Sequence, residues 1–246
     1  MKLLQADERE FPHMALIGFG VGRFEDYKCG GSLISEQWVL SAAHCSYDQL
    51  LGSAKHIKLG GIKRLELEAS TKIFSIIENI KHPSYSNFIV EHDIVLFKMH
   101  EPVEFSLHIL PICLQQSDAL PTQRAIATGW GKTENITGMS PVLLRVSLNY
   151  LPISSCQNSF QNEDEFDGVD FNNIVCAGSK EAKDTCLGDS GSPLQYYNKD
   201  HYCMYTISGI TAHGSAFCGK SASGAIYTKV FKYLDWIENI VWPQKN

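Results

Sequence analysis

The sequence predicts an all-β fold, an antiparallel barrel or sandwich, from two observations. Apolar runs of about five to eight residues recur along the chain of 246 residues, and Gly, Pro, Asn or Ser separates them. Between these runs the apolar residues lack helical spacing, which favours strands over helices. Many short strands joined by turns are typical of antiparallel β architectures.

The predicted strands follow one another along the chain. They lie in the stretches MALIGFG (14–20), SLISEQWVLSA (32–42), HIKLGG (56–61), IFSIIENIKHP (73–83), DIVLFKM (93–99), RAIATGWG (124–131), VLLRVSLNYL (142–151), YTISGIT (205–211) and GAIYTKV (224–230).

Two segments depart from this pattern. Apolar residues recur at helical spacing in KVFKYLDWIENIV (about 229–241), and Pro243 ends the pattern, so we expect a C-terminal amphipathic helix packed on a barrel. The stretch 100–121 contains three prolines and has no clear period. We expect a linker at about 106–121 that joins two halves of similar size, at about 11–105 and 122–228.

Composition excludes two classes of partner. Hydrophobic residues at 44% and charged residues at 20% are globular values, and the formal net charge of −6 argues against a nucleic-acid binder. No apolar run approaches the roughly eighteen residues that a membrane-spanning helix needs. The start, MKLLQADEREF, lacks the apolar region of a signal peptide.

Cysteine usage nevertheless indicates an exported protein. Eight cysteines lack the CxxC spacing of a zinc site, so disulfides formed in an oxidising compartment are the favoured interpretation. Asn135 opens the glycosylation pattern NIT, which agrees with export. We therefore expect a secreted, extracellular protein with a further segment upstream of Met1.

Three segments carry residues suited to nucleophilic catalysis. His44 lies beside Cys45 at the end of the stretch GGSLISEQWVLSAAHC, Asp93 opens an apolar strand, and Ser190 lies in DTCLGDSGSPL. Taken singly, each has a plainer interpretation: a structural histidine, a capping aspartate and a serine in a tight turn. The catalytic interpretation requires all three to converge.

Together these segments resemble the chymotrypsin-like (trypsin-family) serine endopeptidases. SAAHC, DIVL and GDSG occur in the family's order, and EFPHM, CGGSLIS, HPSY, GWG and IYTKV extend the resemblance from about Phe11 to the last helix. The resemblance implies two six-stranded antiparallel β-barrels and a C-terminal helix, with the active site between the barrels. CMYTISGIT is similar to the insect clip-domain group of this family.

The resemblance also assigns catalytic roles. His44 is expected to remove the proton of the Ser190 hydroxyl and return it to the leaving amine, while Asp93 fixes the imidazole tautomer. The backbone N–H groups of Gly188 and Ser190 are expected to form the oxyanion hole. No cofactor or metal takes part, and Glu66 and Glu68 do not make a convincing calcium site.

Substrate specificity follows from a second set of positions. Asp184, six residues before Ser190, matches the base of the specificity pocket in trypsin-like members, which implies cleavage after Arg or Lys. The alternative is a solvated loop aspartate. Gly214 matches a pocket wall, and Ala225 stands where the family usually has glycine, so its methyl group is expected to narrow the pocket.

The resemblance pairs six of the cysteines. The implied disulfides are Cys29–Cys45, Cys156–Cys176 and Cys186–Cys218. Cys113 and Cys203 remain, and two alternatives stay open for them. They bond each other, which we slightly favour, or one of them bonds an upstream segment. In multidomain relatives, the cysteine at the position of Cys113 often bonds such a segment.

Two departures concern activation. The family's enzymes free an Ile-Val-Gly-Gly terminus whose ammonium pairs with the aspartate before the nucleophile, here Asp189. The chain instead starts MKLLQA, so Asp189 has no evident cation and activity of the chain as written is in question. Ser192 replaces a family glycine, and we expect backbone strain there if glycine's freedom is needed.

The sequence therefore predicts a secreted serine endopeptidase that cleaves proteins after Arg or Lys in an extracellular cascade. Its expected partners are protein substrates, protein protease inhibitors and an upstream clip domain of the same precursor. The alternative is a catalytically impaired homologue that acts as an extracellular binding or adaptor module.

Overall fold

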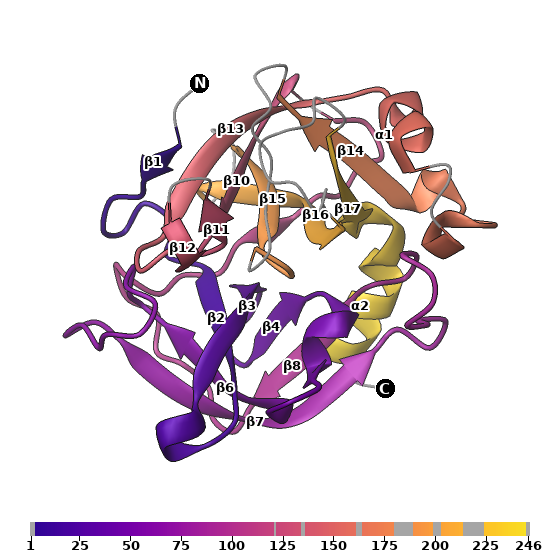
Figure 1. The fold of residues 1–246 in the computed structure, drawn as a ribbon. Helices are drawn as coiled ribbons and strands as arrows, with labels where there is room; N and C mark the ends of the chain where they lie inside the picture. Colours follow the sequence, from indigo (N-terminus) through magenta and orange to yellow (C-terminus); the bar gives the residue numbers. More distant parts are fainter. Residues whose placement is uncertain are drawn as a thin grey trace.

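Two closed β-barrels form the body of the molecule (Figure 1). A computed structural model of the chain describes residues 3–120, 122–133, 136–160, 164–179, 189–198, 203–213 and 224–244. Each barrel has six antiparallel strands, as the family resemblance implied. Short strands extend both barrels, and short helical segments cover their edges.

The first barrel is made from the N-terminal half of the chain. Its neighbouring strands, in order, are β2 (Met14–Phe19), β3 (Asp26–Leu33), β4 (Trp38–Ser41), β8 (Val95–Met99), β7 (Lys72–Lys81) and β6 (Gly52–Leu59). Pairing of β2 with β6 closes the barrel, and β5 (Tyr47–Asp48) extends it beside β6. Every residue of β2 and β4 is buried, which explains why both segments are nearly continuous apolar runs.

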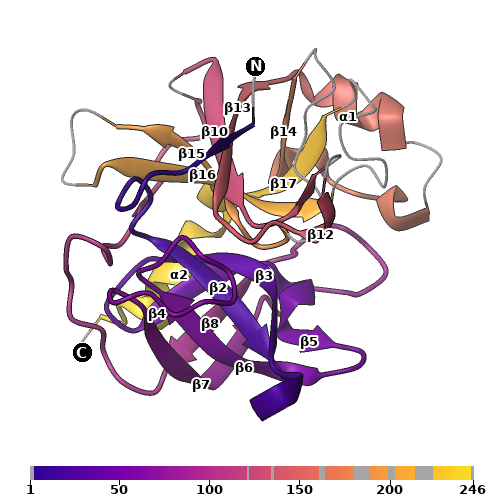
Figure 2. The ribbon, with the colours of Figure 1, turned by 60° about the vertical axis from the view of Figure 1, so that its left-hand side comes forward.

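The second barrel is made from the C-terminal half. Its strands, in order, are β13 (Leu144–Tyr150), β10 (Arg124–Gly129), β15 (Pro193–Tyr197), β16 (Tyr205–His213), β17 (Ala225–Lys229) and β14 (Ile174–Gly178). Pairing of β13 with β14 closes it. Two short strands join this barrel from elsewhere: β1 (Leu4–Gln5) pairs with β13, and β9 (Cys113–Leu114) pairs in parallel with β16. A small hairpin of β11 (Lys132–Thr133) and β12 (Ile136–Met139) follows β10. Figure 2 shows β1 lying along the second barrel.

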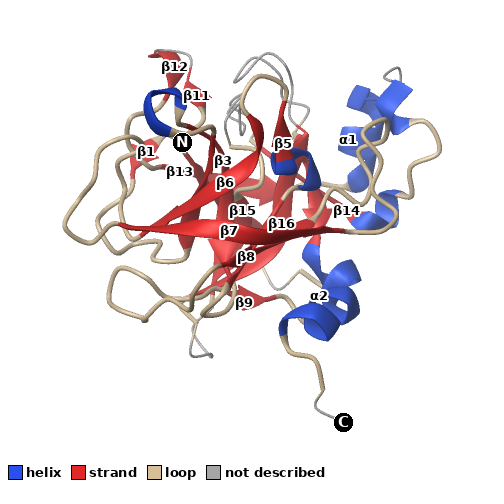
Figure 3. Ribbon diagram, turned by 90° about the horizontal axis from the view of Figure 1, so that it is seen from below, coloured by secondary structure: helices blue, strands red, loops and turns tan. Residues whose placement is uncertain are grey.

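Within the described ranges, two α-helices lie at the periphery of the strands (Figure 3). The predicted C-terminal helix is α2 (Leu234–Val241), and the residues just before it form the 3-10 turn Val230–Tyr233. Ile237 is fully buried and belongs to the same core cluster as the first barrel, so α2 ties the end of the chain to that barrel. Other 3-10 turns lie at Gly22–Phe24, Ala43–Ser46, Asp164–Phe166 and Phe171–Asn173.

The helix α1 (Ile153–Phe160) was not predicted from the sequence. It spans only two turns and buries two side chains, those of Cys156 and Phe160. Its apolar pattern is therefore too short to show a helical period. A disulfide from Cys156 to Cys176 attaches it to β14.

The described residues form three disulfides: Cys29–Cys45, Cys113–Cys203 and Cys156–Cys176. Cys113 and Cys203 thus bond each other, and among the described cysteines none is free. Cys186 and Cys218 lie outside the described residues. Within the described part of the chain, no helix is long and apolar enough to cross a bilayer.

Candidate active site

Strand register brings His44 and Asp93 together. β4 pairs with β8 so that Ser41 faces Val95, and therefore the turn after β4 adjoins the residues before β8. His44 Nδ1 lies 2.6 Å from Asp93 Oδ2, and the backbone N–H of His44 donates to Asp93 Oδ1 at 2.9 Å. The Asp93 side chain is only 6% exposed, whereas that of His44 is 36% exposed. Part of the His44 side chain thus remains open to solvent.

The carboxylate controls the charge of this histidine. Burial alone would lower the pKa of His44, but the negative charge of Asp93 and its hydrogen bond outweigh burial and raise the pKa above 6.5. The pair therefore stabilises an imidazolium, which is the state that a general base reaches after it has taken a proton.

The second barrel supports Asp93 from behind. The hydroxyl of Thr228, in β17, donates to the backbone carbonyl of Asp93 at 3.0 Å. The His44–Asp93 pair, which comes from the first barrel, is thereby attached to the second. The site lies where the two barrels meet.

Ser190 lies at the same junction. Its backbone carbonyl accepts a hydrogen bond from Gly30 N in β3 at 2.8 Å. Gly191 follows with a φ of 78°, and a Cβ there would collide with the hydroxyl of Ser41, three residues before His44. Only glycine fits this close approach. The turn that carries Ser190 therefore packs against the end of β4, three residues before His44.

Ser192 does not show the strain expected of it. The non-glycine residues with positive φ in the described chain are Arg9 and His92. Ser192 is fully buried instead, and its hydroxyl has no hydrogen-bond partner among the described residues. The cost of this serine is an unsatisfied hydroxyl rather than a distorted backbone.

Asp189 faces the two glycines of the GWG motif. Its Oδ1 accepts a hydrogen bond from Gly131 N at 2.8 Å, and a Cβ on Gly129 or Gly131 would collide with the carboxylate. A small pocket beside it is also lined by Leu3 and Lys132. In the sequence, GWG contributed only to the family resemblance. Its two glycines, on either side of a tryptophan, could have indicated that another segment of the chain approaches the backbone closely there.

Several predicted residues lie outside the described part of the chain. They are Asp184, Gly188, Gly214 and the glycosylation candidate Asn135. Ala225 is described, and it is fully buried in β17 within the cluster that contains Val175, Ala177 and Tyr227. Its methyl group is part of the packed interior of the second barrel.

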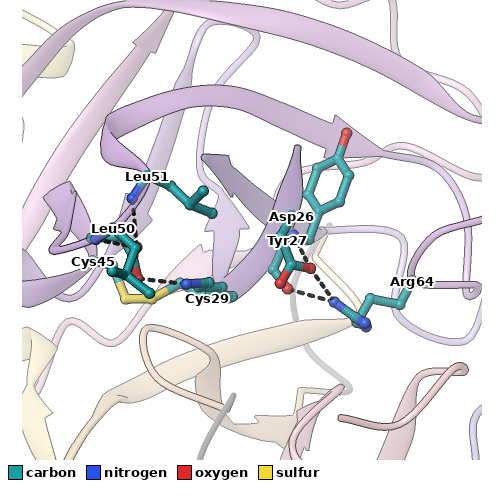
Figure 4. A network of polar contacts seen from close by, with 9 residues as sticks. Asp26, Tyr27, Cys29, Cys45, Leu50, Leu51 and Arg64 are labelled. Carbon is teal, nitrogen blue, oxygen red and sulfur yellow. Dashed lines mark hydrogen bonds and ion pairs between the residues drawn. A yellow bond between two sulfur atoms is a disulfide. The ribbon is translucent and has the colours of Figure 1, made fainter. Parts of the chain in front are cut away.

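A charged network fixes the strand beside the site (Figure 4). Lys28 Nζ contacts Asp48 Oδ2 at 2.8 Å, and Asp48 Oδ1 accepts the N–H groups of Leu50 and Leu51. On the same strand, Asp26 pairs with Arg64 at 2.7 Å. These contacts hold two loops against β3 next to the Cys29–Cys45 disulfide, which adjoins His44.

An ammonium group organises the loop that holds Glu66 and Glu68. Only 3% of the surface of Lys58 is exposed. Its Nζ donates to the backbone carbonyls of Lys63, Arg64 and Glu66 at 2.9, 3.1 and 2.6 Å.

One cluster of residue types that can bind a metal occurs among the described residues, and it consists of Cys29, Cys45 and His44. Its two sulfur atoms are bonded to each other and cannot act as thiolate ligands.

Comparison with known proteins identifies the family. The family model described as "Trypsin" matches residues 4–237. This chain belongs to the trypsin family. Across 95% of its length it is 35% identical to "Serine protease snk" of Drosophila melanogaster, and across 98% it is 34% identical to "Phenoloxidase-activating factor 1" of Holotrichia diomphalia. It is also 31% identical to "Anionic trypsin" of Canis lupus familiaris across 96% of its length.

The relatives differ in how much of them this trypsin-family chain covers. It spans 55% of the Drosophila protease and 70% of the Holotrichia protein, but 86% of the dog trypsin. The insect relatives therefore contain long regions that this chain does not match.

Proposed function

We propose that the chain is a serine endopeptidase in which Ser190 attacks the substrate carbonyl, His44 is the general base and Asp93 orients His44. The observation that carries this proposal is the 2.6 Å contact between His44 Nδ1 and Asp93 Oδ2. A hydrogen on Nδ1 that points at the carboxylate leaves Nε2 with its lone pair. Nε2 is then the atom that accepts the proton of Ser190.

The catalytic cycle follows from these roles. Ser190 Oγ bonds to the carbonyl carbon as its proton moves to His44 Nε2, and the backbone N–H groups of Gly188 and Ser190 bind the oxygen that becomes negative. The imidazolium, stabilised by Asp93, then gives its proton to the leaving amine. Water repeats the sequence on the acyl-enzyme, with His44 again as the base.

The substrate pocket is proposed to contain Asp184 at its base, with Gly214 and Ala225 beside it. A carboxylate at the bottom of a pocket pairs with the guanidinium of Arg or the ammonium of Lys, so cleavage follows these residues. The position of Asp184, six residues before Ser190, supports this assignment.

Activation is proposed to act through Asp189. Its carboxylate lies beside Gly129 and Gly131 in a pocket that Leu3 also lines, so the N-terminal segment already reaches this pocket. A newly cut terminus that enters it would place an ammonium next to the carboxylate. The chain would then be made as a zymogen.

An extracellular cascade is the proposed setting. Three disulfides and the acceptor Asn135 fit an oxidising, exported environment. The similarity to a phenoloxidase-activating factor and to the snk protease supports a place among cascade proteases. Protein substrates, protein inhibitors and an upstream clip domain are the partners that follow.

Hydrolysis of amide reporters that end in Arg, Lys or Phe tests the proposal. The chain is used as it stands and in a form that starts with Ile followed by Met1→Val, Lys2→Gly and Leu3→Gly. We expect this second form to cleave after Arg and Lys about a hundredfold or more faster than after Phe, because a Phe side chain offers the Asp184 carboxylate no positive charge to pair with.

Two variants control the assay. Ser190→Ala should abolish hydrolysis of every reporter, and Asp184→Ser should remove the preference for Arg and Lys while leaving a slow activity. A folded protein with an Ile-Val-Gly-Gly start that hydrolyses no reporter would instead support the adaptor alternative.

A further inference from the structure

A second histidine lies immediately before Asp93. His92 has a φ of 58°, in the left-handed region that non-glycine residues rarely adopt. Its carbonyl accepts the N–H of Ile94 at 2.8 Å, so a tight turn surrounds Asp93. Such a conformation persists only where neighbouring contacts hold it. The side chain of His92 provides those contacts.

Three segments hold the His92 ring. It stacks on the ring of His82, with centroids 4.9 Å apart and planes inclined by 14°. Its Nδ1 lies 3.1 Å from the hydroxyl of Tyr233, which comes from the turn before α2. Its Nε2 lies 3.5 Å from Glu91 Oε1, and that carboxylate is itself bound by Asn173. The ring is therefore held by the stack on His82 and by contacts at both nitrogens.

His82 completes the attachment. Its backbone N–H donates at 3.1 Å to the carbonyl of Ile94, the residue directly after Asp93. One ring of the stack thus belongs to the residue before Asp93, and the other belongs to a residue that is hydrogen-bonded to the residue after it. The edges of His82 contact Tyr233 and Trp236. Displacement of this ring pair would shift the turn that presents the Asp93 carboxylate to His44.

We propose that His92 is a positioning residue for Asp93, and that its stacking on His82 makes the placement of Asp93 depend on the charge of the histidine pair. This inference rests on the proposed function, in which Asp93 orients His44. Two neutral imidazole rings can stack without charge repulsion, whereas two positively charged imidazolium rings in the same stack repel each other.

The surrounding charges set the balance of the pair. Glu91 contacts His92, and Tyr233 contacts both rings of the pair. The other titratable and charged groups nearby are Asp93, which follows His92, Lys81, which precedes His82 and lies over the ring of Tyr85, and Asp170, whose backbone N–H donates to Glu91. Burial and then the neighbouring charge of His92 lower the pKa of His82. Burial and the carboxylates of Glu91, Asp93 and Asp170 raise the pKa of Tyr233, which keeps its hydroxyl proton. The stacked histidines His82 and His92 therefore accept a first positive charge more readily than a second.

Acid should therefore affect catalysis twice, once through His44 and once through the stack. In the chain that starts Ile-Val-Gly-Gly and is otherwise unaltered, we expect kcat/KM to fall below neutral pH more steeply than the titration of a single group produces. In His82→Phe, which keeps an aromatic ring but no proton, the fall should follow one group. His100→Asn is the matched control, because His100 also lies beside a glutamate, Glu101, but at the opposite end of β8.

The positioning role has its own variants. His92→Asn should lower kcat at pH 8 less than His92→Ala does, because asparagine tolerates the left-handed region but cannot stack on His82. His92→Ala should lower kcat by about ten- to a hundredfold with little change in KM, because Asp93 is then misplaced. Equal effects of the two variants on kcat, or equal acid limbs in His82→Phe and the unaltered chain, would overturn the inference.

A titration by NMR separates this inference from the proposed function. The Cε1 protons of His82 and His92 are followed from pH 8 to pH 4 in the intact protein, which requires no catalysis. Coupled titration that becomes a single simple curve for His92 in His82→Phe supports the inference even if no reporter is cleaved. Independent titration of the two rings in the unaltered chain overturns it even if the chain is an active protease.

Discussion

At the scale of single residues, Asp93 should determine the pH at which His44 loses its proton. A base must be neutral to act, and the pKa of His44 is raised above 6.5, so the acid limb of kcat/KM should have its midpoint above pH 6.5. Asp93→Asn removes the negative charge and should move this midpoint down while lowering kcat by about 10⁴-fold, the value for the trypsin-type triad. Reporter hydrolysis from pH 5 to 9 measures both. An unchanged midpoint in Asp93→Asn would contradict the assignment.

The His44–Asp93 pair also makes the stability of the fold depend on pH. Acid lowers activity by protonating His44, but the same protonation stabilises the fold. Because the pKa of His44 is higher in the folded chain than in the unfolded chain, the protonated form stabilises the fold. This contribution is complete below about pH 6.5 and is lost as pH rises through the folded pKa.

Two buried serines near Ser190 should respond oppositely to alanine. Ser192 Oγ has no partner among the described residues, whereas Ser41 Oγ donates to Gly30 O at 2.7 Å. Ser192→Ala should therefore raise the free energy of unfolding by about 1 kcal/mol, and Ser41→Ala should lower it by about 1 kcal/mol. Chemical denaturation measures both. Destabilisation by Ser192→Ala would show that the hydroxyl has a partner in solution.

Residue identities at the site were predictable where a motif was local. His44, Asp93 and Ser190 each lie in a short segment with a characteristic neighbourhood, and so they could be named from the sequence. Contacts between distant segments could not be predicted, because no spacing in the chain shows that Thr228 supports Asp93 or that His92 stacks on His82.

At the scale of elements, Lys58 should determine the order of the loop that follows β6. Its ammonium donates to three backbone carbonyls of that loop. Lys58→Met keeps the length of the side chain but removes the donor, and should lower the free energy of unfolding by about 2 kcal/mol. Lys55→Met, on an exposed position of the same strand, should change it by less than about 0.5 kcal/mol. Equal effects of the two changes would contradict this account.

Strands and helices could be predicted where the apolar residues of a segment follow a clear pattern. The apolar runs at 14–20, 93–99 and 224–230 became strands β2, β8 and β17, since a strand buried on both faces needs little more than an apolar run. The helix α1 was missed because tertiary contacts through Cys156 and Phe160, rather than a long amphipathic pattern, hold it. Pairings between strands, such as β1 with β13, carry no local signal.

At the scale of the whole molecule, the disulfides should differ in what they contribute. Cys113–Cys203 closes a separation of 90 residues and attaches β9, in the connection between the barrels, to the start of β16. Cys156–Cys176 closes a separation of only 20. Replacing both cysteines by serine should cost about 4 to 5 kcal/mol for the first pair and about 3 kcal/mol for the second in the chain-entropy model. Guanidinium unfolding of the two double variants measures the difference, and a larger loss from the second pair would contradict it.

For the molecule as a whole, we propose that the two barrels bring an imidazole, a carboxylate and an alcohol to one junction. Covalent labelling with a fluorophosphonate, mapped by mass spectrometry, tests this claim most directly in the chain with the Ile-Val-Gly-Gly start. We predict a single adduct on Ser190 whose rate of formation falls at least about a thousandfold in His44→Ala. An adduct on another residue, or equal rates with and without His44, would contradict the claim.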